Sequence, residues 1–202
     1  MSKDICIFGG SFDPVHLGHK RLADFVTDKL SLEKMLIIPA AMSPFKSTSG
    51  GTAEDRLTMC RLAFPEEKYE VSDIEIKRGG KSYTVDTVRA VKKLYPDSRL
   101  SLLIGSDQLL SFNRWYCYKE ILSLVTLISV SREDSVKTEK LREFAEKELS
   151  AYGECKILDF DPLEISSTEL REAIEKNEDT SLFLEKTVRA YIDEKGLYKN
   201  AE

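Results

Sequence analysis

Short β-rich apolar runs alternate with amphipathic segments along this chain, and the alternation constrains the fold more than any other feature. We expect strands at 5–8, 35–39, 69–76, 100–105, 125–131 and 155–160. We expect helices at 17–30, 53–64, 85–94, 116–123, 137–150, 168–176 and 183–195. The runs at 100–105 and 125–131 are largely apolar, which is typical of strands buried on both faces. The alternation therefore predicts parallel strands joined by right-handed crossovers, that is, an α/β, doubly wound, Rossmann-like sheet with helices on both faces.

Length and composition predict one domain over residues 1–202, because no repeat, low-complexity tract or linker divides the chain. The balance of 30 basic and 35 acidic residues gives a net charge of −5 without a basic block, which argues against nucleic-acid binding. No apolar stretch approaches the roughly 20 residues that span a bilayer, and the N-terminus lacks a signal-peptide pattern. We expect no membrane partner and a cytoplasmic location. The four scattered cysteines predict reduced thiols, with Cys6 in the core.

Both histidines of the chain lie in one segment, FGGSFDPVHLGH, which runs from Phe8 to His19. We expect the first strand to end at Phe8, which places the segment at the carboxyl edge of the sheet, where such folds bind ligands. Gly9 and Gly10 would let the backbone approach a ligand closely and turn tightly. The next helix is expected to begin near Leu17, with free N–H groups that point to the same place. The segment therefore predicts an anion site.

Other nucleotide-binding motifs do not fit this segment. Its glycines do not satisfy G-x-G-x-x-G, and the second strand ends in Pro39, where a dinucleotide-binding fold would carry an acidic residue. No G-K-[ST] sequence of a P-loop occurs. His16 and His19 are three residues apart, so at a helix start they share a face. Metal ligation lacks further ligands and a core pair fits poorly beside an exposed glycine, so hydrogen bonding to phosphate is the better interpretation.

A second segment, ISSTELR, begins another predicted helix near the C-terminal end. Ser166, followed three residues later by Glu169, predicts an N-cap with a capping box. Ser167 and Thr168 would add N–H and hydroxyl donors, and Arg171 would add a cation one turn later. Together with GGSFDPVHLGH, this segment resembles the signature of the nucleotidyltransferase superfamily. The resemblance implies that its H-x-G-H and I-S-S-T-x-x-R motifs bind the phosphates of one ATP.

Three further stretches are similar to the nicotinate mononucleotide adenylyltransferase family: DIEIKRGGKSYTVDTV (73–88), LLIGSDQLLSFNRW (102–115) and VRAYIDEKGLY (188–198). With them the resemblance covers the whole chain as one nucleotidyltransferase domain. It implies an enzyme of NAD biosynthesis that transfers the adenylyl group of ATP to nicotinate mononucleotide, giving nicotinate adenine dinucleotide and pyrophosphate. Both nucleotides would be substrates, and Mg²⁺ would bridge the ATP phosphates without a dedicated protein ligand. Association into a homo-oligomer is compatible with the sequence.

The resemblance also assigns residues to each substrate. It implies ATP contacts by Gly9, Gly10, Ser11, Phe12, His16, His19, Gly105, Asp107, Ser166, Ser167, Thr168 and Arg171. It implies nicotinate mononucleotide contacts by Lys46, Tyr83, Thr84, Trp115, Tyr116 and Arg132. The residues expected to act in catalysis are His16, His19, Lys46 and Arg171. Within the ATP set, Asp107 resembles the aspartate that contacts the ribose.

Residues at the pyridine end also have simpler interpretations, which stay open. Thr84 precedes an amphipathic helix and would serve as its cap, although the same helix start would also receive a nicotinate carboxylate. Trp115, the only tryptophan, would be core in most chains, but a flat ring after the polar loop SFNR suits stacking on a pyridinium. Tyr116 would add a hydroxyl to the carboxylate. Arg132 would either meet a phosphate or lie on the surface.

The longest stretch without predicted structure is 40–51, which is either a functional loop or a plain surface loop. Its only charge is Lys46. The family usually carries His-Lys here, whereas this chain has Phe45 before Lys46, so one phosphate donor is missing. Thr52 then predicts a helix N-cap, with Asp55 three residues on.

Two alternatives to the implied function remain. One is the same chemistry on nicotinamide mononucleotide, since the acid and the amide differ only in contacts made by a few backbone amides. The other is a non-catalytic nucleotide-sensing module, against which the retained histidines, lysine and arginine argue.

Overall fold

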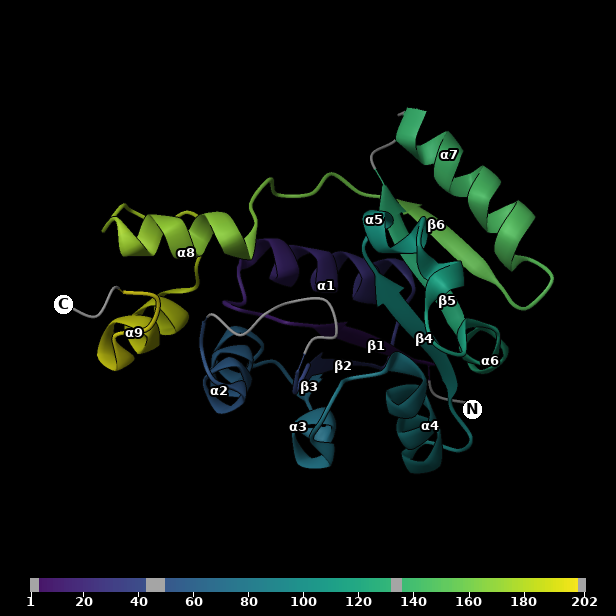
Figure 1. Cartoon of the computed structure of the whole chain (residues 1–202), viewed down its shortest axis with the longest axis horizontal. Coiled ribbons are helices and arrows are strands. Elements are labelled where there is room, and N and C mark those ends of the chain that lie inside the picture. The colour runs from purple at the N-terminus through teal and green to yellow at the C-terminus, as the bar shows by residue number, and fades with distance from the viewer. Residues whose placement is uncertain (1–3, 43–49, 132–135, 200–202) are drawn as a thin grey trace.

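A six-stranded parallel sheet forms the centre of the protein (Figure 1). The computed structural model describes residues 4–42, 50–131 and 136–199. The strands lie in the order β3-β2-β1-β4-β5-β6, and each neighbouring pair is parallel. Their bounds are β1 Asp4–Gly10, β2 Lys34–Pro39, β3 Tyr69–Val71, β4 Arg99–Ile104, β5 Thr126–Ser131 and β6 Cys155–Asp159. The predicted doubly wound α/β class is confirmed.

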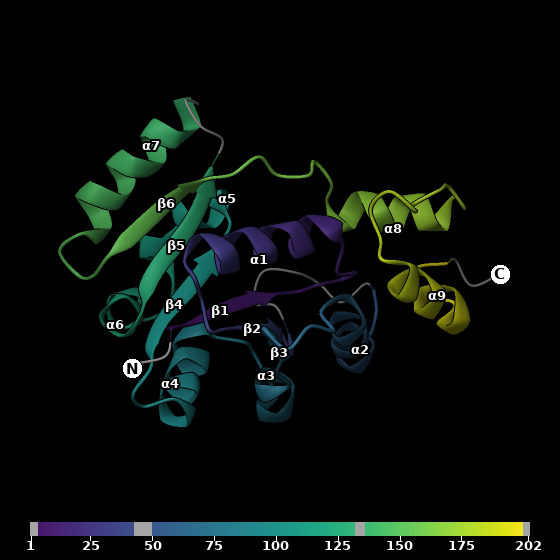
Figure 2. The same cartoon turned by 180° about the vertical axis from the view of Figure 1, so that it is seen from behind.

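Helices connect the strands and cover both faces of the sheet. The α-helices are α1 Leu17–Lys29, α2 Ala53–Ala63, α3 Ile74–Arg78, α4 Thr84–Leu94, α5 Ser106–Leu109, α6 Tyr118–Leu124, α7 Val136–Phe144, α8 Ser167–Glu175 and α9 Lys186–Lys195. A 3-10 turn at Phe112–Arg114 and a π-helical turn at Ala145–Leu149 complete the set. Helices α1 and α8 lie on the opposite side of the sheet from α4 (Figures 1 and 2). Within the described residues, no helix has the length and apolar composition needed to cross a membrane.

Side chains of the central strand β1 belong to two hydrophobic clusters, one on each face of the sheet. Cys6 and Phe8 belong to a cluster that includes residues of α1, α2, α8 and α9. Ile5 and Ile7 belong to a cluster on the other face, with residues of α4, α6 and α7. Successive side chains of a strand point to opposite faces, so a strand covered on both sides must be apolar throughout. This explains the run ICIF and confirms that Cys6 lies in the core.

The prediction of a strand over 69–76 is wrong beyond Val71. The amide of Ser72 still donates to a β2 carbonyl, but α3 begins two residues later. The side chain of Glu75 is then buried and accepts a hydrogen bond from the hydroxyl of Thr87 on α4. A short apolar run does not distinguish strand from helix, and here the buried contact with α4 favours the helix.

Other elements also differ from the expectation: α9 begins at Lys186 rather than at 183, and α7 ends at Phe144, where the π-helical turn follows. Strand β1 continues to Gly10, because Gly9 and Gly10 pair with the end of β2. Helix α6 begins at Tyr118 rather than at 116, because Cys117 has a φ of 55°, in the left-handed region. Most of the segment SFNR, expected to be a loop, forms the 3-10 turn.

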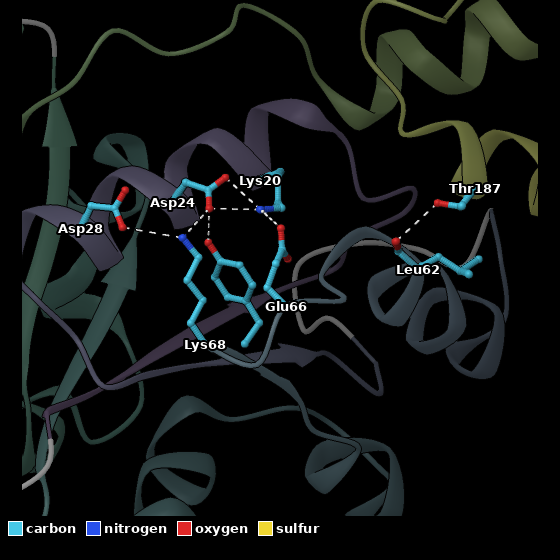
Figure 3. A network of polar contacts seen from close by, with 8 residues as sticks. Lys20, Asp24, Asp28, Leu62, Glu66, Lys68 and Thr187 are labelled. Carbon is cyan, nitrogen blue, oxygen red and sulfur yellow. Dashed lines mark hydrogen bonds and ion pairs between the residues drawn. The ribbon is translucent and has the colours of Figure 1, made fainter.

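A network of charged groups fixes α1 to the start of β3 (Figure 3). The Lys20 ammonium lies 2.9 Å from a carboxylate oxygen of Asp24 and 2.8 Å from one of Glu66. Asp24 also accepts from the Tyr69 hydroxyl and lies 2.9 Å from the Lys68 ammonium. Lys20 is the residue after His19, so the network holds the helix that begins with the histidine motif.

We expect Asp24→Ala to lower the free energy of unfolding by about 1–2 kcal/mol, because it leaves several donors without their acceptor at a partly exposed site. Asp28→Ala is the matched control: Asp28 lies one turn further along α1, its side chain is 75% exposed, and Lys68 is 3.6 Å away. Its cost should stay within about 0.5 kcal/mol. Urea unfolding of both variants at pH 7 measures the difference, and equal costs would contradict the role given to Asp24.

Candidate functional site

The strand order reverses between β1 and β4, and the carboxyl ends of these strands define the candidate site. Strand β1 pairs with β2 on one side and with β4 on the other. In open α/β sheets, ligands bind at such a switch point. A cavity of about 120 Å³ lies there, and its lining includes Gly10, Ser11, Glu75, Thr84, Gln108 and Trp115. The cavity thus joins the glycine-rich segment to the residues predicted at the pyridine end.

The two glycines at the end of β1 do not form the expected tight turn. Both lie in the strand, and neither has a positive φ. A Cβ on Gly10 would lie 3.0 Å from the ring of Phe12, whereas one on Gly9 would meet only a carbonyl oxygen at 4.0 Å. The left-handed residue is Phe12 itself, with a φ of 49° and a buried ring. Gly10 therefore leaves room for a buried aromatic ring, and Gly9 leaves the strand end open to the site.

The histidines lie face to face at the start of α1. His16 is the N-cap residue, and its amide donates to Nδ1 of His19 at 3.2 Å. Their ring centroids are 3.7 Å apart. Gly18 makes this possible, because a Cβ there would lie 2.9 Å from Nδ1 of His16. The two rings therefore form one preorganised unit.

His16 is nearly buried, with 8% of its surface exposed. Its Nδ1 atom has no hydrogen-bond partner among the described residues. Burial lowers the pKa of His16 from 6.5 to about 4, so the imidazole is neutral near pH 7. A buried polar atom without a partner is costly, and a ligand that accepts a hydrogen bond would remove part of this cost. This arrangement favours a binding role over a satisfied core pair.

The expectation of free amides at the start of α1 is partly wrong. The amide of Leu17 donates to the carbonyl of Phe183 at 2.8 Å, and the amide of His19 donates to the carbonyl of His16 at 2.9 Å. The loop before α9 therefore covers part of this helix end. Any anion bound here would depend on the imidazole rings more than on these two amides.

The second motif packs against the first, although about 150 residues separate them. Ser166 caps α8, and the predicted capping box with Glu169 is confirmed. The Ser167 hydroxyl donates to the carbonyl of Pro14 at 3.0 Å. The guanidinium of Arg171 donates to the carbonyl of Asp13 at 2.7 Å. These contacts bring the start of α8 to the segment that precedes the histidines.

The predicted pyridine-binding residues lie at the other side of the cavity. Tyr83 rather than Thr84 is the N-cap of α4, so the interpretation of Thr84 as a cap is wrong, and Thr84 is the first helical residue. Trp115 is half-buried and packs on Phe112, with ring centroids 5.0 Å apart. The rings of Tyr83 and Tyr116 are 5.3 Å apart, and both are exposed. Trp115 and Thr84 line the cavity together, as expected for one binding site.

Of four further predicted residues, the structure places two. Gly105 is the N-cap of α5 and Asp107 lies in its first turn, so both follow the carboxyl end of β4. Lys46 and Arg132, and also Phe45, lie outside the described residues. The capping box of Thr52 and Asp55 at the start of α2 is confirmed.

Sequence reasoning missed Arg56, which lies on α2 and is 8% exposed. Its guanidinium donates to the carbonyls of Ser11 at 2.8 Å and of Ala41 at 3.1 Å. The helical pattern around it gave no signal, since an arginine in an amphipathic helix is usually solvated. Arg56 therefore holds the exit of β1 beside the exit of β2.

Sequence reasoning also missed the acidic groups around the site. Asp13 accepts hydrogen bonds from the Gly51 amide and the Tyr198 hydroxyl. Glu75 lines the cavity, and it lies on α3, where the sequence predicted a strand. Among the described residues, no cluster of three or more His, Cys, Asp or Glu side chains could hold a metal ion.

Comparisons with known proteins agree with this geometry. The family profile described as "Cytidylyltransferase-like" matches residues 7–173. A protein of Gemmatimonas aurantiaca, described as a probable nicotinate-nucleotide adenylyltransferase, is 37% identical over 96% of this chain and 91% of its own length. A protein of Fusobacterium nucleatum with the same description is 36% identical over 94% of this chain and 96% of its own length.

A solved structure has the same fold. The Plasmodium falciparum nicotinic acid mononucleotide adenylyltransferase, complexed with NaAD, superposes with a TM-score of 0.78 at 20% identity and covers 97% of each chain. The extent and level of the sequence matches decide the family. The chain belongs to the nicotinate-nucleotide adenylyltransferase family, within the cytidylyltransferase-like proteins.

Proposed function

We propose that this protein transfers the adenylyl group of ATP to nicotinate mononucleotide, releasing pyrophosphate and forming nicotinate adenine dinucleotide for NAD biosynthesis. One observation carries the proposal. The start of α8 contacts Asp13 and Pro14, in the segment that leads into the histidine pair, and Gly10 and Ser11 of the same segment line the switch-point cavity. Trp115 and Thr84 line that cavity, which suits a second nucleotide with a flat ring. Membership of the family supports the same reaction.

The reaction needs no protein nucleophile. The 5′-phosphate oxygen of the mononucleotide attacks the α-phosphorus of ATP in line, the new P–O bond forms, and the bond to the bridging oxygen breaks with pyrophosphate leaving. The protein would contribute positioning and hydrogen bonds to the developing charge. His16 is neutral, and its ring with that of His19 offers N–H donors without loss of a proton. Arg171 adds a fixed positive charge at the same end.

Mg²⁺ fits this site as an ion carried by the nucleotide. Mg²⁺ keeps several water ligands and commonly binds through substrate phosphates. The side chains around the histidines donate hydrogen bonds, and the Asp13 carboxylate already accepts two. The ion would neutralise charge on the ATP phosphates, while Ser167, Thr168 and Arg171 would hold the phosphate oxygens. From the sequence alone, Lys46 would assist at the phosphates and Arg132 at the mononucleotide.

The pyridine ring would stack on Trp115, whose position is set by its packing on Phe112. The carboxylate of the ring would then face the start of α4 at Thr84, where a helix N-terminus favours an anion. Gly105 and Asp107, at the end of β4, would contact the ATP ribose. The location in the cytoplasm belongs to the same proposal.

We expect His16→Ala and His19→Ala each to lower turnover by about 10²–10³, because each removes a preorganised donor from the phosphate end. Pyrophosphate release under saturating substrates measures the loss, and circular dichroism verifies that the fold is kept. Thr187→Ala provides a control away from the histidines, since the Thr187 hydroxyl donates to the carbonyl of Leu62 on α2 at 3.4 Å (Figure 3). Near-native turnover in either histidine variant would contradict the assigned roles.

The buried His16 should also make stability depend on pH. Its pKa is about 4 in the folded protein and near 6.5 when unfolded. As the pH falls from 7 towards 4, the unfolded state binds a proton that the folded state does not, so the free energy of unfolding decreases by about 2–3 kcal/mol. His16→Gln should remove this part of the decrease. Urea unfolding at pH 7 and pH 4.5 measures it, and parallel pH profiles of the two proteins would refute the prediction.

The substrate itself is tested by pyrophosphate release with ATP and each mononucleotide in turn. A carboxylate only accepts hydrogen bonds, whereas a carboxamide also presents donors. Each mismatched polar group in a closed site costs about 1–3 kcal/mol, so the acid should be preferred by about tenfold or more in kcat/KM. Trp115→Ala should weaken both mononucleotides equally and leave ATP affinity unchanged. Equal efficiency on the amide would exclude the specificity but keep the adenylyl transfer, and no release with either would exclude the function.

A further inference from the structure

Asp13 connects three segments that are far apart in the sequence. Its Oδ1 atom accepts a hydrogen bond from the amide of Gly51 at 2.9 Å and another from the hydroxyl of Tyr198 at 2.7 Å. Its main-chain carbonyl accepts the guanidinium of Arg171 at 2.7 Å. The Asp13 side chain is therefore held by two distant segments. The main-chain carbonyl of the same residue holds Arg171, the arginine that we propose binds phosphate.

The contact between Tyr198 and Asp13 is close and partly buried. Tyr198 lies just beyond the end of α9 and is half-buried. A Cβ on Gly51 would lie 3.3 Å from its hydroxyl oxygen, and one on Gly50 would collide with the Asp13 carboxylate at 2.0 Å. Burial, and then the Asp13 charge, raise the pKa of the Tyr198 hydroxyl far above its usual value. The hydroxyl thus remains a donor, and the absence of a side chain at Gly50 leaves room for the Asp13 carboxylate.

We propose that Tyr198 is a positioning residue for catalysis: its hydroxyl fixes Asp13, and Asp13 in turn fixes Arg171 at the phosphate end of the site. This inference rests on the proposed function. The C-terminal tail would then contribute to turnover without contacting a substrate. A plain structural anchor would affect stability alone, so the two roles can be separated by experiment.

Tyr191, which lies on α9 itself, provides a matched control. Its hydroxyl donates to Asp55 at 2.8 Å, the carboxylate of the α2 capping box. Each tyrosine therefore donates one hydrogen bond to an aspartate. Asp13 also accepts a hydrogen bond from Arg171 at its main-chain carbonyl, whereas Asp55 belongs to the α2 capping box. Tyr198→Phe and Tyr191→Phe each remove one hydroxyl and keep the ring.

We expect both variants to lose thermal stability to a similar degree. Only Tyr198→Phe should lower kcat, by about three- to tenfold, which corresponds to one hydrogen bond. The KM for nicotinate mononucleotide should not change, because its pyridine end lies elsewhere. Turnover of Tyr198→Phe within twofold of the native enzyme, or an equal loss in Tyr191→Phe, would overturn the proposal.

A double-mutant cycle tests the route through Asp13. Asp13→Ala combined with Tyr198→Phe should lose no more turnover than Asp13→Ala alone, whereas Asp13→Asn, which keeps an acceptor oxygen, should recover most of it. Additive losses would overturn the route.

One readout is independent of activity: amide exchange of Gly51, followed by NMR, should quicken in Tyr198→Phe and not in Tyr191→Phe. Unchanged exchange in Tyr198→Phe would overturn the proposal, whereas a native protein that releases no pyrophosphate would exclude only the proposed function.

Discussion

The irregular segment between β1 and α1 carries the site, and its shape depends on side chains that reach it from distant helices. Arg56 of α2 holds the carbonyl of Ser11, while Arg171 and Ser167 of α8 hold those of Asp13 and Pro14. Buried carbonyls need partners, and here charged or hydroxyl side chains provide them in place of a β-ladder. Without these three side chains, the backbone that leads into the histidine pair would lose its hydrogen-bond partners. The sheet therefore sets where the candidate site lies, and these hydrogen bonds set the conformation of its backbone.

At the histidine pair, the binding role that we propose would come at a cost in stability. A neutral imidazole with a buried, unpartnered nitrogen lowers the stability of the folded state, and a hydrophobic residue would avoid this cost. The same features keep the ring dry, uncharged and fixed in orientation before a ligand arrives. Preorganised donors need no reorganisation in the transition state. The charged network around Asp24, further along α1, helps to hold the helix that begins with this histidine pair.

The parts of the fold that follow from local patterns could be predicted, and the parts set by tertiary contacts could not. The run ICIF and the capping box at Ser166 are local signals, and both are confirmed. The strand expected to 76 is wrong because Glu75 finds its partner on another helix. Arg56 has an ordinary sequence context, and Tyr198 ends the family-like stretch 188–198 without any assigned contact; only the folded chain shows that both reach the same short segment. Nothing in the spacing of a sequence records which carbonyl a distant arginine will contact.

The net charge of the protein bears on how it would bind its proposed substrates. A chain of net charge −5 repels anions at long range, yet both proposed substrates are anions. Beyond about 8–10 Å, salt screens most of that repulsion, so the groups at the site decide binding. At the candidate site these groups are the neutral imidazole of His16, the start of α4 and an arginine already held by a carbonyl. Such donors act over short distances and in fixed directions, which favours a correctly placed phosphate over any anion nearby. Selectivity for the reacting geometry would then come from hydrogen-bond direction rather than from accumulated positive charge.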